Sequence, residues 1–301
     1  PFPCAVHGVV HTMWLTIIHG GSITLRYTNM VAALSSGATG GAPTVANTAM
    51  GASTRDTHPK TITGRGIWGV TTTIFAPTPS TRTFLNVLEH ARLCSVGDKK
   101  TDDSVWRRFQ KEVGGSRVVY LSASDQEALS TSGQFEAVQL LPWNHFGRKN
   151  LGYLYAIRAG AEWIFDYDDD NILNTPVAHS MLATVLRSHT MPSVKTNYPL
   201  YNPYPDFKPT LRGKPAFVWP RGFPLDYIRS NMTFDKEFTG QTPIEQVHVF
   251  QSLADHDPDV DAIYRMTQGL PLYFSERSKM AAVPKGTYAC YLLMLSPTHC
   301  A

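Results

Sequence analysis

Four aspartates occupy five positions directly after a hydrophobic run, in the sequence WIFDYDDDN from Trp163 to Asn171. The run 163–166 has the length and the apolar side chains of a buried strand. Carboxylates at this spacing repel one another, and burial strengthens the repulsion. The chain must therefore place these acids where a positive charge can offset them, and the source of that charge is a guide to function.

Strands and helices alternate along the chain from Gly64 onward. Strands are expected at 67–75, 93–96, 118–121 and 163–166. Helices are expected after a cap at Ser80 or Thr81, over part of 101–113, over 148–161 and, with Thr175 as cap, over 175–187. This order predicts an α/β protein with a mostly parallel sheet covered by helices. Ligands of such sheets bind beyond the carboxyl ends of the strands, where Asp98 and the aspartate cluster lie.

The composition fits one large globular domain with appendages. The chain has 301 residues, of which 43% are hydrophobic and 17% charged. A formal net charge of +3 is too small to indicate nucleic acid, so we expect no nucleic-acid partner. The four cysteines show no spacing typical of a metal site, and no apolar run is long enough to span a membrane.

Three regions follow from the distribution of residue types. Residues 1–62 are rich in Ala, Gly, Thr and Ser, which predicts a low-complexity stem or linker without fixed structure. We expect the folded domain over 63–288 and an atypical, truncated tail over 289–301. Because the chain begins with Pro rather than Met, we expect a fragment whose signal or anchor lies upstream.

A divalent cation explains the aspartate cluster best. Aspartates after a strand often cap the next helix, and capping stays an alternative, but residues 174–176 already supply a helix start. Carboxylate oxygens at a strand end suit Mg²⁺ or Mn²⁺, which also bind substrate phosphates. We therefore predict that Asp168, Asp169 and Asp170 bind Mg²⁺ or Mn²⁺.

Two basic residues at the start of the expected helix 148–161 point to a phosphate. Arg148 and Lys149 oppose the helix dipole there, at a cost of roughly 0.3–1 kcal/mol each. A bound phosphate reverses this penalty, because helix N-termini and basic side chains both favour anions. We predict a nucleotide diphosphate held between these cations and the metal, with a solvated basic turn as the alternative.

Three further residues each have a functional and a structural interpretation. Asp98 is expected to accept hydrogen bonds from a base or ribose, or to act as a turn residue. His145 either contacts the diphosphate or satisfies a loop backbone. Arg221, in the string WPRGFPL, is expected near phosphate or sugar, with a structural turn as the alternative.

Longer strings resemble a known family. WGVTTTIFAPT, VGDKKT, LPWNHFGRKNLGYLYAIRAGAEWIFDYDDDN, NPYPDF, WPRGFPLDYI and QSLADHDPDVDAIYRMT together look like the STELLO family of glycosyltransferases, over roughly residues 65–288. The string DDDN looks like the DxD-type motif of GT-A nucleotide-sugar glycosyltransferases. The resemblance implies a GT-A-like sandwich with a mostly parallel central sheet. More weakly, DDD and RGFPL resemble the reversibly glycosylated polypeptides, which are UDP-arabinopyranose mutases.

This resemblance implies a metal-dependent glycosyltransferase with a nucleotide-diphosphate sugar donor, for which we expect a UDP-sugar. The acceptor is an unknown glycan or protein. The family also implies the Golgi lumen, a membrane anchor upstream, membrane-bound glycan synthases as partners and a role in cell-wall polysaccharide synthesis. Thr72 and Asn150 lie in the matching strings and are assigned to nucleotide or diphosphate binding. After Tyr288 the sequence departs from the family pattern.

The second acidic stretch, 255–261, is the expected source of a catalytic carboxylate. Inverting glycosyl transfer needs a base near the acceptor hydroxyl. We assign this role to Asp259 or Asp261, and Arg221 joins them as a catalytic candidate. An Asp-Pro turn followed by a helix cap is the structural alternative.

Other functions stay open at the level of sequence. The fold is also compatible with a non-catalytic scaffold for other glycosyltransferases or with a UDP-sugar mutase. A phosphatase of the haloacid dehalogenase type is a weaker alternative, since Asp166 and Asp168 fit the start of its motif. That motif expects Thr or Val where Asp170 stands.

Overall fold

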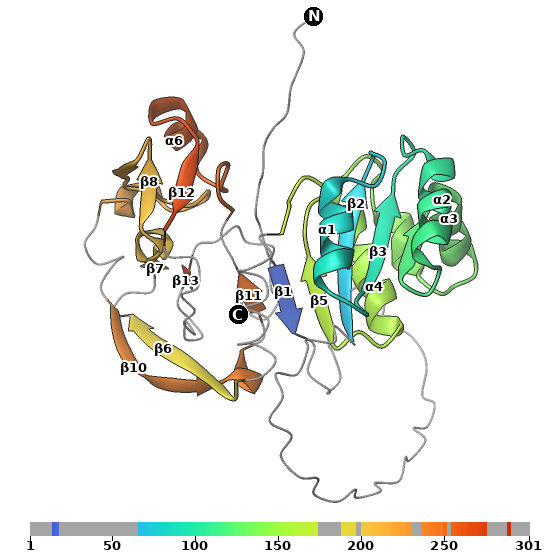
Figure 1. Ribbon diagram of the computed structural model, residues 1–301, viewed down its shortest axis with the longest axis horizontal. Helices are drawn as coiled ribbons and strands as arrows, with labels where there is room; N and C mark the ends of the chain where they lie inside the picture. Colours follow the sequence, from blue (N-terminus) through green and yellow to red (C-terminus); the bar gives the residue numbers. More distant parts are fainter. Residues whose placement is uncertain are drawn as a thin grey trace, which may run out of the picture. The chain divides into compact units, whose positions relative to one another are not determined.

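The computed structural model describes residues 14–17, 66–173, 188–196, 200–229, 236–247, 249–251, 254–275 and 288–289 (Figure 1). The chain divides into two compact units, Pro1–Gly21 with Ile62–Leu292, and Ser22–Thr61 with Leu293–Ala301. Every described residue lies in the first unit. The predicted helix 175–187 and its cap lie outside the described residues, as do most of the predicted stem and tail.

Four parallel strands form the centre of the main sheet, in the order β5 (Trp163–Asp166), β2 (Ile67–Thr73), β3 (Arg92–Gly97) and β4 (Val118–Leu121). Beyond β5 the sheet continues with β1 (Trp14–Ile17), which pairs antiparallel with β5. The edge strand β11 (Val249–Gln251) pairs antiparallel with β1. The predicted α/β class and mostly parallel sheet are confirmed. Strand β1 comes from the segment predicted to be a stem, so that segment contributes to the sheet.

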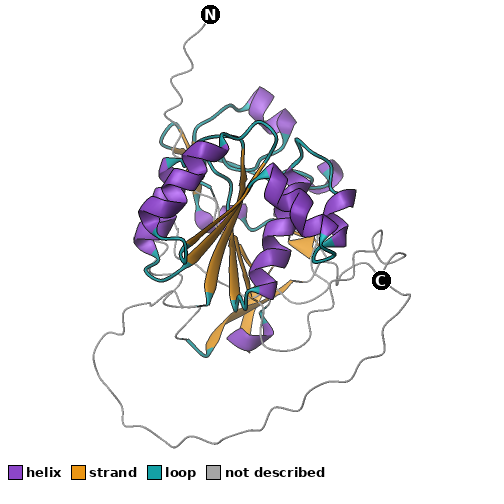
Figure 2. Cartoon of the chain, turned by 90° about the vertical axis from the view of Figure 1, so that its right-hand side faces the viewer, coloured by secondary structure: helices purple, strands orange, loops and turns teal. Residues whose placement is uncertain are grey.

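Both faces of the sheet are covered by helices, as Figure 2 shows. Neighbouring side chains of a strand point to opposite faces, so Leu93 and Cys94 of β3 enter different hydrophobic clusters. The cluster of Leu93 includes Phe84 and Trp106 from α1 and α2, whereas that of Cys94 includes Leu151 from α4. Burial on both faces explains why these strands read as nearly continuous apolar runs.

The helices of this layer begin at identifiable caps. Helix α1 (Pro79–Val87) is capped by the Thr78 side chain, which accepts a hydrogen bond from the Thr81 amide. The predicted cap at Ser80 or Thr81 is therefore wrong, because Pro79 occupies the first helical position and fixes the start there. Helix α2 (Asp103–Val113) is capped by Asp102.

Helix α3 (Ala123–Thr131) was not expected from the sequence, although Ser122 and Asp125 form a capping box at its start. The 3-10 turn η2 (Glu136–Leu140) follows it. Another 3-10 turn, η3 (Phe146–Arg148), leads into α4 (Lys149–Arg158), so the predicted helix over 148–161 is shorter at both ends.

The remaining described elements are short. They are β6 (Thr190–Thr196) paired with β10 (Lys236–Pro243), the sheet β12 (Leu272–Phe274), β8 (Pro209–Leu211) and β9 (Lys214–Pro215), the pair β7 (Leu200–Tyr201) and β13 (Tyr288–Ala289), the helix α6 (Ala262–Thr267), and the 3-10 turns η4 (Tyr204–Phe207), η5 (Leu225–Tyr227) and η7 (Ile244–Gln246). A third hydrophobic cluster, which includes Tyr204, Val260 and Tyr264, lies among them. None of the described helices is long and apolar enough to cross a membrane.

Candidate functional site

The aspartate loop lies at the point where the strand order of the sheet reverses. From β2 the chain moves outward through β3 to β4, and then returns to place β5 on the other side of β2. Crevices at such positions are where open α/β sheets bind ligands. Three hydroxyls from the end of β2 and the start of α1 hold the loop: Thr73 donates to the Asp169 carboxylate, Thr78 to the Asp169 carbonyl at 2.6 Å, and Ser80 to the Asn171 carbonyl.

Lys149 supplies the positive charge that the aspartate cluster requires. Its Nζ atom donates to Asp166 Oδ1 and Asp168 Oδ1, both at 2.7 Å, and to the Tyr167 carbonyl at 3.1 Å. The residue is only 3% exposed. Burial alone would lower the pKa of the ammonium, but the charges of Asp166 and Asp168 outweigh burial and raise that pKa above its ordinary value. Lys149 thus lies among the aspartates of the loop rather than apart from them.

Arg148 points elsewhere. Its Nε donates to Gln126 Oε1 and its Nη1 to the Leu141 carbonyl, both at 2.8 Å. The guanidinium carbon lies 3.5 Å from the centre of the Trp143 ring. Consecutive helical residues are rotated by about 100°, so neighbouring cations at a helix start face different surroundings. Binding of a diphosphate by Arg148 and Lys149 stays a prediction, and the structure gives the two residues separate protein partners.

Two carboxylates of the loop are open to solvent. The side chain of Asp168 is 66% exposed, and Asp170 is also exposed. Although Asp170 is exposed, partial desolvation of its carboxyl, followed by repulsion from Asp168, raises its pKa above the ordinary value. Burial likewise raises the pKa of Asp169, which is also repelled by its two neighbours. Excess negative charge therefore persists in the loop despite Lys149.

Metal binding by Asp168, Asp169 and Asp170 stays a prediction, and the structure shows which of these carboxylates are exposed. Within the described ranges, no group of three or more His, Cys, Asp or Glu side chains is arranged to hold a metal ion. Asp169 is half-buried and held by Thr73, whereas Asp168 and Asp170 are exposed, and Lys149 occupies only one oxygen of Asp168. Mg²⁺ is commonly bound through one or two carboxylates, with water and substrate phosphates completing the shell. The residues present fit such a partial site.

Asp98 connects the end of β3 to the loop before α4. The residue is buried, and its two carboxylate oxygens accept hydrogen bonds from the Lys99 amide at 2.7 Å and the Asn144 amide at 2.8 Å. These contacts match the structural alternative. A role for Asp98 in nucleotide binding stays a prediction.

The other predicted nucleotide-binding residues lie in the same layer. His145 is exposed, and its Nδ1 accepts a hydrogen bond from the Gly147 amide at 2.9 Å, which caps η3. Thr72 is partly buried in β2 opposite Val96 of β3. Asn150 is partly buried in the first turn of α4. Binding of a nucleotide by these three residues stays a prediction.

Two predicted catalytic residues meet in the structure. Arg221 Nη2 lies 2.7 Å from Asp259 Oδ1, and the Arg221 amide donates to the Asp259 carbonyl at 3.1 Å. Burial raises the pKa of Asp259, even though Arg221 and Arg265 act in the opposite direction. Asp261, in contrast, caps α6 by accepting a hydrogen bond from the Ile263 amide at 2.7 Å. This contact matches the helix cap that was the structural alternative for Asp261.

The fold brings the two acidic stretches within electrostatic range of each other. The charge of Asp168 contributes to the raised pKa of Asp259, and the charge of Asp257 contributes to that of Asp170. Asp257 itself forms an ion pair with Arg265. The candidate site therefore combines the open carboxylates of the loop with the Asp259–Arg221 pair.

Sequence reasoning missed several residues that shape this site. Thr73 could have been found, because it lies near the carboxyl end of the predicted strand 67–75. Tyr204, whose hydroxyl donates to the Asp259 carbonyl at 2.9 Å, carries no local signal. Arg265, which pairs with Asp257, was not predicted either.

A mostly parallel α/β sheet with an aspartate-rich loop at its reversal point defines a protein of the GT-A-like class. No protein-family model matches the chain. Two proteins of Arabidopsis thaliana do match it: probable glycosyltransferase STELLO2 at 30% identity and probable glycosyltransferase STELLO1 at 29%, each over 188 residues. These matches confirm the resemblance carried by the motifs: over the matched region the chain is similar to the two STELLO proteins.

The alignment with these relatives covers only part of each protein. The matched region covers 56% of this chain and 22% of each relative. The chain therefore spans about a fifth of the length of the curated relatives it matches. Activity, substrates and partners of the whole protein are matters of proposal.

Proposed function

We propose that this chain carries the donor-binding region of a metal-dependent STELLO-type glycosyltransferase, which transfers a sugar from a nucleotide-diphosphate donor such as a UDP-sugar. The observation that carries the proposal is the pair of open carboxylates, Asp168 and Asp170, at the reversal point of a parallel sheet. The relatives' names support transfer of a sugar, and the raised pKa of Asp170 supports a cation as the missing charge.

Asp168 and Asp170 would hold Mn²⁺ or Mg²⁺. A cation bound there supplies positive charge that offsets the negative charge developing on a departing diphosphate. Lys149 fixes one oxygen of Asp168, and Thr73 fixes Asp169, so the loop is held in place before any ligand arrives. Such preorganisation reduces the entropy that binding must overcome.

Asp259 is the proposed general base. Its carboxylate would accept the proton of the acceptor hydroxyl, a role that favours a pKa raised toward the working pH. Arg221 holds one oxygen of that carboxylate at 2.7 Å and is half exposed, so its remaining N–H groups can reach donor phosphate.

The remaining parts of the proposal come from the family resemblance. The acceptor is an unknown glycan or protein, and other membrane-bound glycan synthases are the expected partners. The Golgi lumen, an upstream membrane anchor and a role in cell-wall polysaccharide synthesis belong to the same proposal.

The proposal is tested by calorimetric titration with UDP, GDP and ADP, each with and without Mn²⁺. We expect one nucleotide to bind in a metal-dependent manner, and Asp170→Asn to abolish that dependence. Asp226→Asn, at an exposed carboxyl of η5, serves as the matched control. Absence of binding by every nucleotide would contradict the proposal and favour a non-catalytic scaffold. Equal binding with and without Mn²⁺ would contradict the metal dependence.

A further inference from the structure

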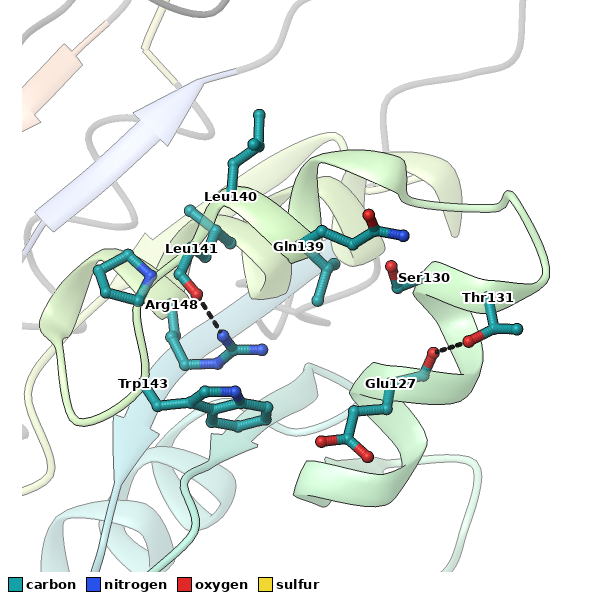
Figure 3. A pocket seen from close by; sticks show the side chains of 10 residues that line it. Glu127, Ser130, Thr131, Gln139, Leu140, Leu141, Trp143 and Arg148 are labelled. Carbon is teal, nitrogen blue, oxygen red and sulfur yellow. Dashed lines mark hydrogen bonds between the residues drawn. The ribbon is translucent and has the colours of Figure 1, made fainter.

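A pocket of about 430 Å³ lies between α3 and the segment that joins η2 to α4 (Figure 3). Glu127 and Ser130 line it from α3, Leu141 and Trp143 from the joining segment, and Arg148 from the start of α4. Its volume is in the range of small-molecule sites. The aspartates of the acidic loop do not belong to its lining.

Two buried polar atoms at this pocket have no hydrogen-bond partner in the described part of the chain. One is Nη2 of Arg148, a residue that is 1% exposed, and the other is Oγ of Ser130, which is 7% exposed. The Nε and Nη1 atoms of Arg148 are already satisfied by Gln126 and the Leu141 carbonyl. Figure 3 shows the guanidinium lying between Leu141 and Trp143. Buried polar groups are nearly always hydrogen-bonded, so these two atoms mark unused hydrogen-bonding capacity beside the pocket.

The charges at the pocket select the kind of ligand. Burial lowers the pKa of Arg148, while the charges of Asp98 and then Glu127 act to raise it; of these two carboxylates, Glu127 lines the pocket together with Arg148. An anion drawn to Arg148 would therefore be repelled by Glu127. A hydroxyl satisfies both residues, because it accepts from the guanidinium and donates to the carboxylate.

We propose that this pocket binds a saccharide unit, whose hydroxyls accept from Arg148 Nη2 and donate to Glu127 and Ser130. A sugar ring presents several hydroxyls at fixed spacing, together with C–H groups that suit the apolar lining around Leu141. The acidic loop contacts Lys149 rather than Arg148, so this is a separate site. The inference goes beyond the proposed donor site and does not depend on it.

The test is a titration of the ¹⁵N-labelled full chain with glucose, xylose, maltose and lactose, followed by nuclear magnetic resonance. The reporter is the indole N–H of Trp143, assigned with Trp143→Phe. We expect at least one saccharide to shift this signal and sodium acetate to leave it unchanged. Glu127→Ala and Ser130→Ala should each weaken binding about fivefold, the effect of one lost hydrogen bond.

Two control variants separate the outcomes. Glu89→Ala, at an exposed carboxyl just beyond α1, should bind the saccharide as the unmodified chain does. Asp170→Asn should also bind it normally, so loss of the proposed metal site and failure of this pocket are distinguishable. No shift with any saccharide would overturn the inference. A shift with acetate that strengthens in Glu127→Ala would also overturn it and identify an anion site.

Discussion

The Lys149 ammonium lies 2.7 Å from Asp166 Oδ1, and both side chains are almost fully buried. The same ammonium reaches the exposed Asp168 at an equal distance, so one cation joins the core of the sheet to the ligand-facing loop. Truncating one member of a buried ion pair leaves an uncompensated charge in the core.

Replacement of Lys149 by Met should therefore destabilise the protein by about 3–5 kcal/mol. The measurement is urea unfolding of Lys149→Met, with Lys111→Met at an exposed position of α2 as control. Adding Asp166→Asn to Lys149→Met should recover part of the loss, because the buried carboxylate is then neutral. A loss no larger than that of the Lys111 variant would show that the pair contributes nothing to stability.

The Thr73 hydroxyl should matter more for ligand binding than for folding. Thr73→Val keeps the shape of the side chain but removes the donor to the Asp169 carboxylate. Because the Thr73 hydroxyl also accepts a hydrogen bond from the Phe75 amide, we expect a loss of about 2 kcal/mol in unfolding free energy, together with weaker binding of Mn²⁺. Titration calorimetry with Mn²⁺ measures the second effect. Thr83→Val on α1 is the control, and equal Mn²⁺ affinities for the two variants would count against a positioning role for Thr73.

Close packing of α4 on the sheet should make Gly152 intolerant of a side chain. A Cβ atom at this position would lie 2.5 Å from Val70 Cγ1 and 3.0 Å from Val96 Cγ2. Both contacts belong to β-strand side chains that have little freedom to move. Gly152→Ala should therefore cost about 1–3 kcal/mol through overpacking.

The control for this prediction is Gly115→Ala, where an added Cβ meets no atom within 4 Å. That change should be neutral or slightly stabilising, since it restricts the unfolded chain. Thermal unfolding of the two variants compares them directly. If Gly152→Ala is as stable as Gly115→Ala, α4 and the sheet can separate enough to accommodate an added methyl group at little cost in free energy.

Asp259 should make stability depend on pH. Its pKa is raised in the folded state, so the folded protein holds this proton more tightly than the unfolded chain does. Stability must then fall as pH rises from the ordinary value of 3.8 through the raised folded pKa, and the cost is fully present above that window. Asp259→Asn removes the titrating group and should remove this part of the pH dependence.

The measurement is the free energy of unfolding of the two proteins between acidic and neutral pH. We expect Asp259→Asn to gain in stability relative to the unmodified chain as pH rises, with the gain vanishing in acid. Asp226→Asn at an exposed site provides the baseline. If Asp259→Asn instead becomes less stable than the unmodified chain as pH rises, Arg221 dominates over burial and lowers the pKa.

Local patterns were enough to predict the parallel sheet and the position of its acidic loop. The strands at 118–121 and 163–166 were predicted with the bounds that the structure shows, because short apolar runs between turn signals specify buried strands. The loop had to follow β5, since the aspartates directly continue that strand. The sequence also placed Arg221 and Asp259 among the candidates, each from its own local string.

The partners of these residues were decided by the tertiary structure. The direction of a side chain at a helix start depends on which face of the helix packs on the sheet, so adjacent Arg148 and Lys149 acquired unrelated partners. The Asp259–Arg221 pair requires the chain to return through the Pro220 and Val260 bridge, which no local pattern encodes. The sequence thus determined which charges the site contains, while long-range packing determined which of them neutralise one another and which stay open for a ligand.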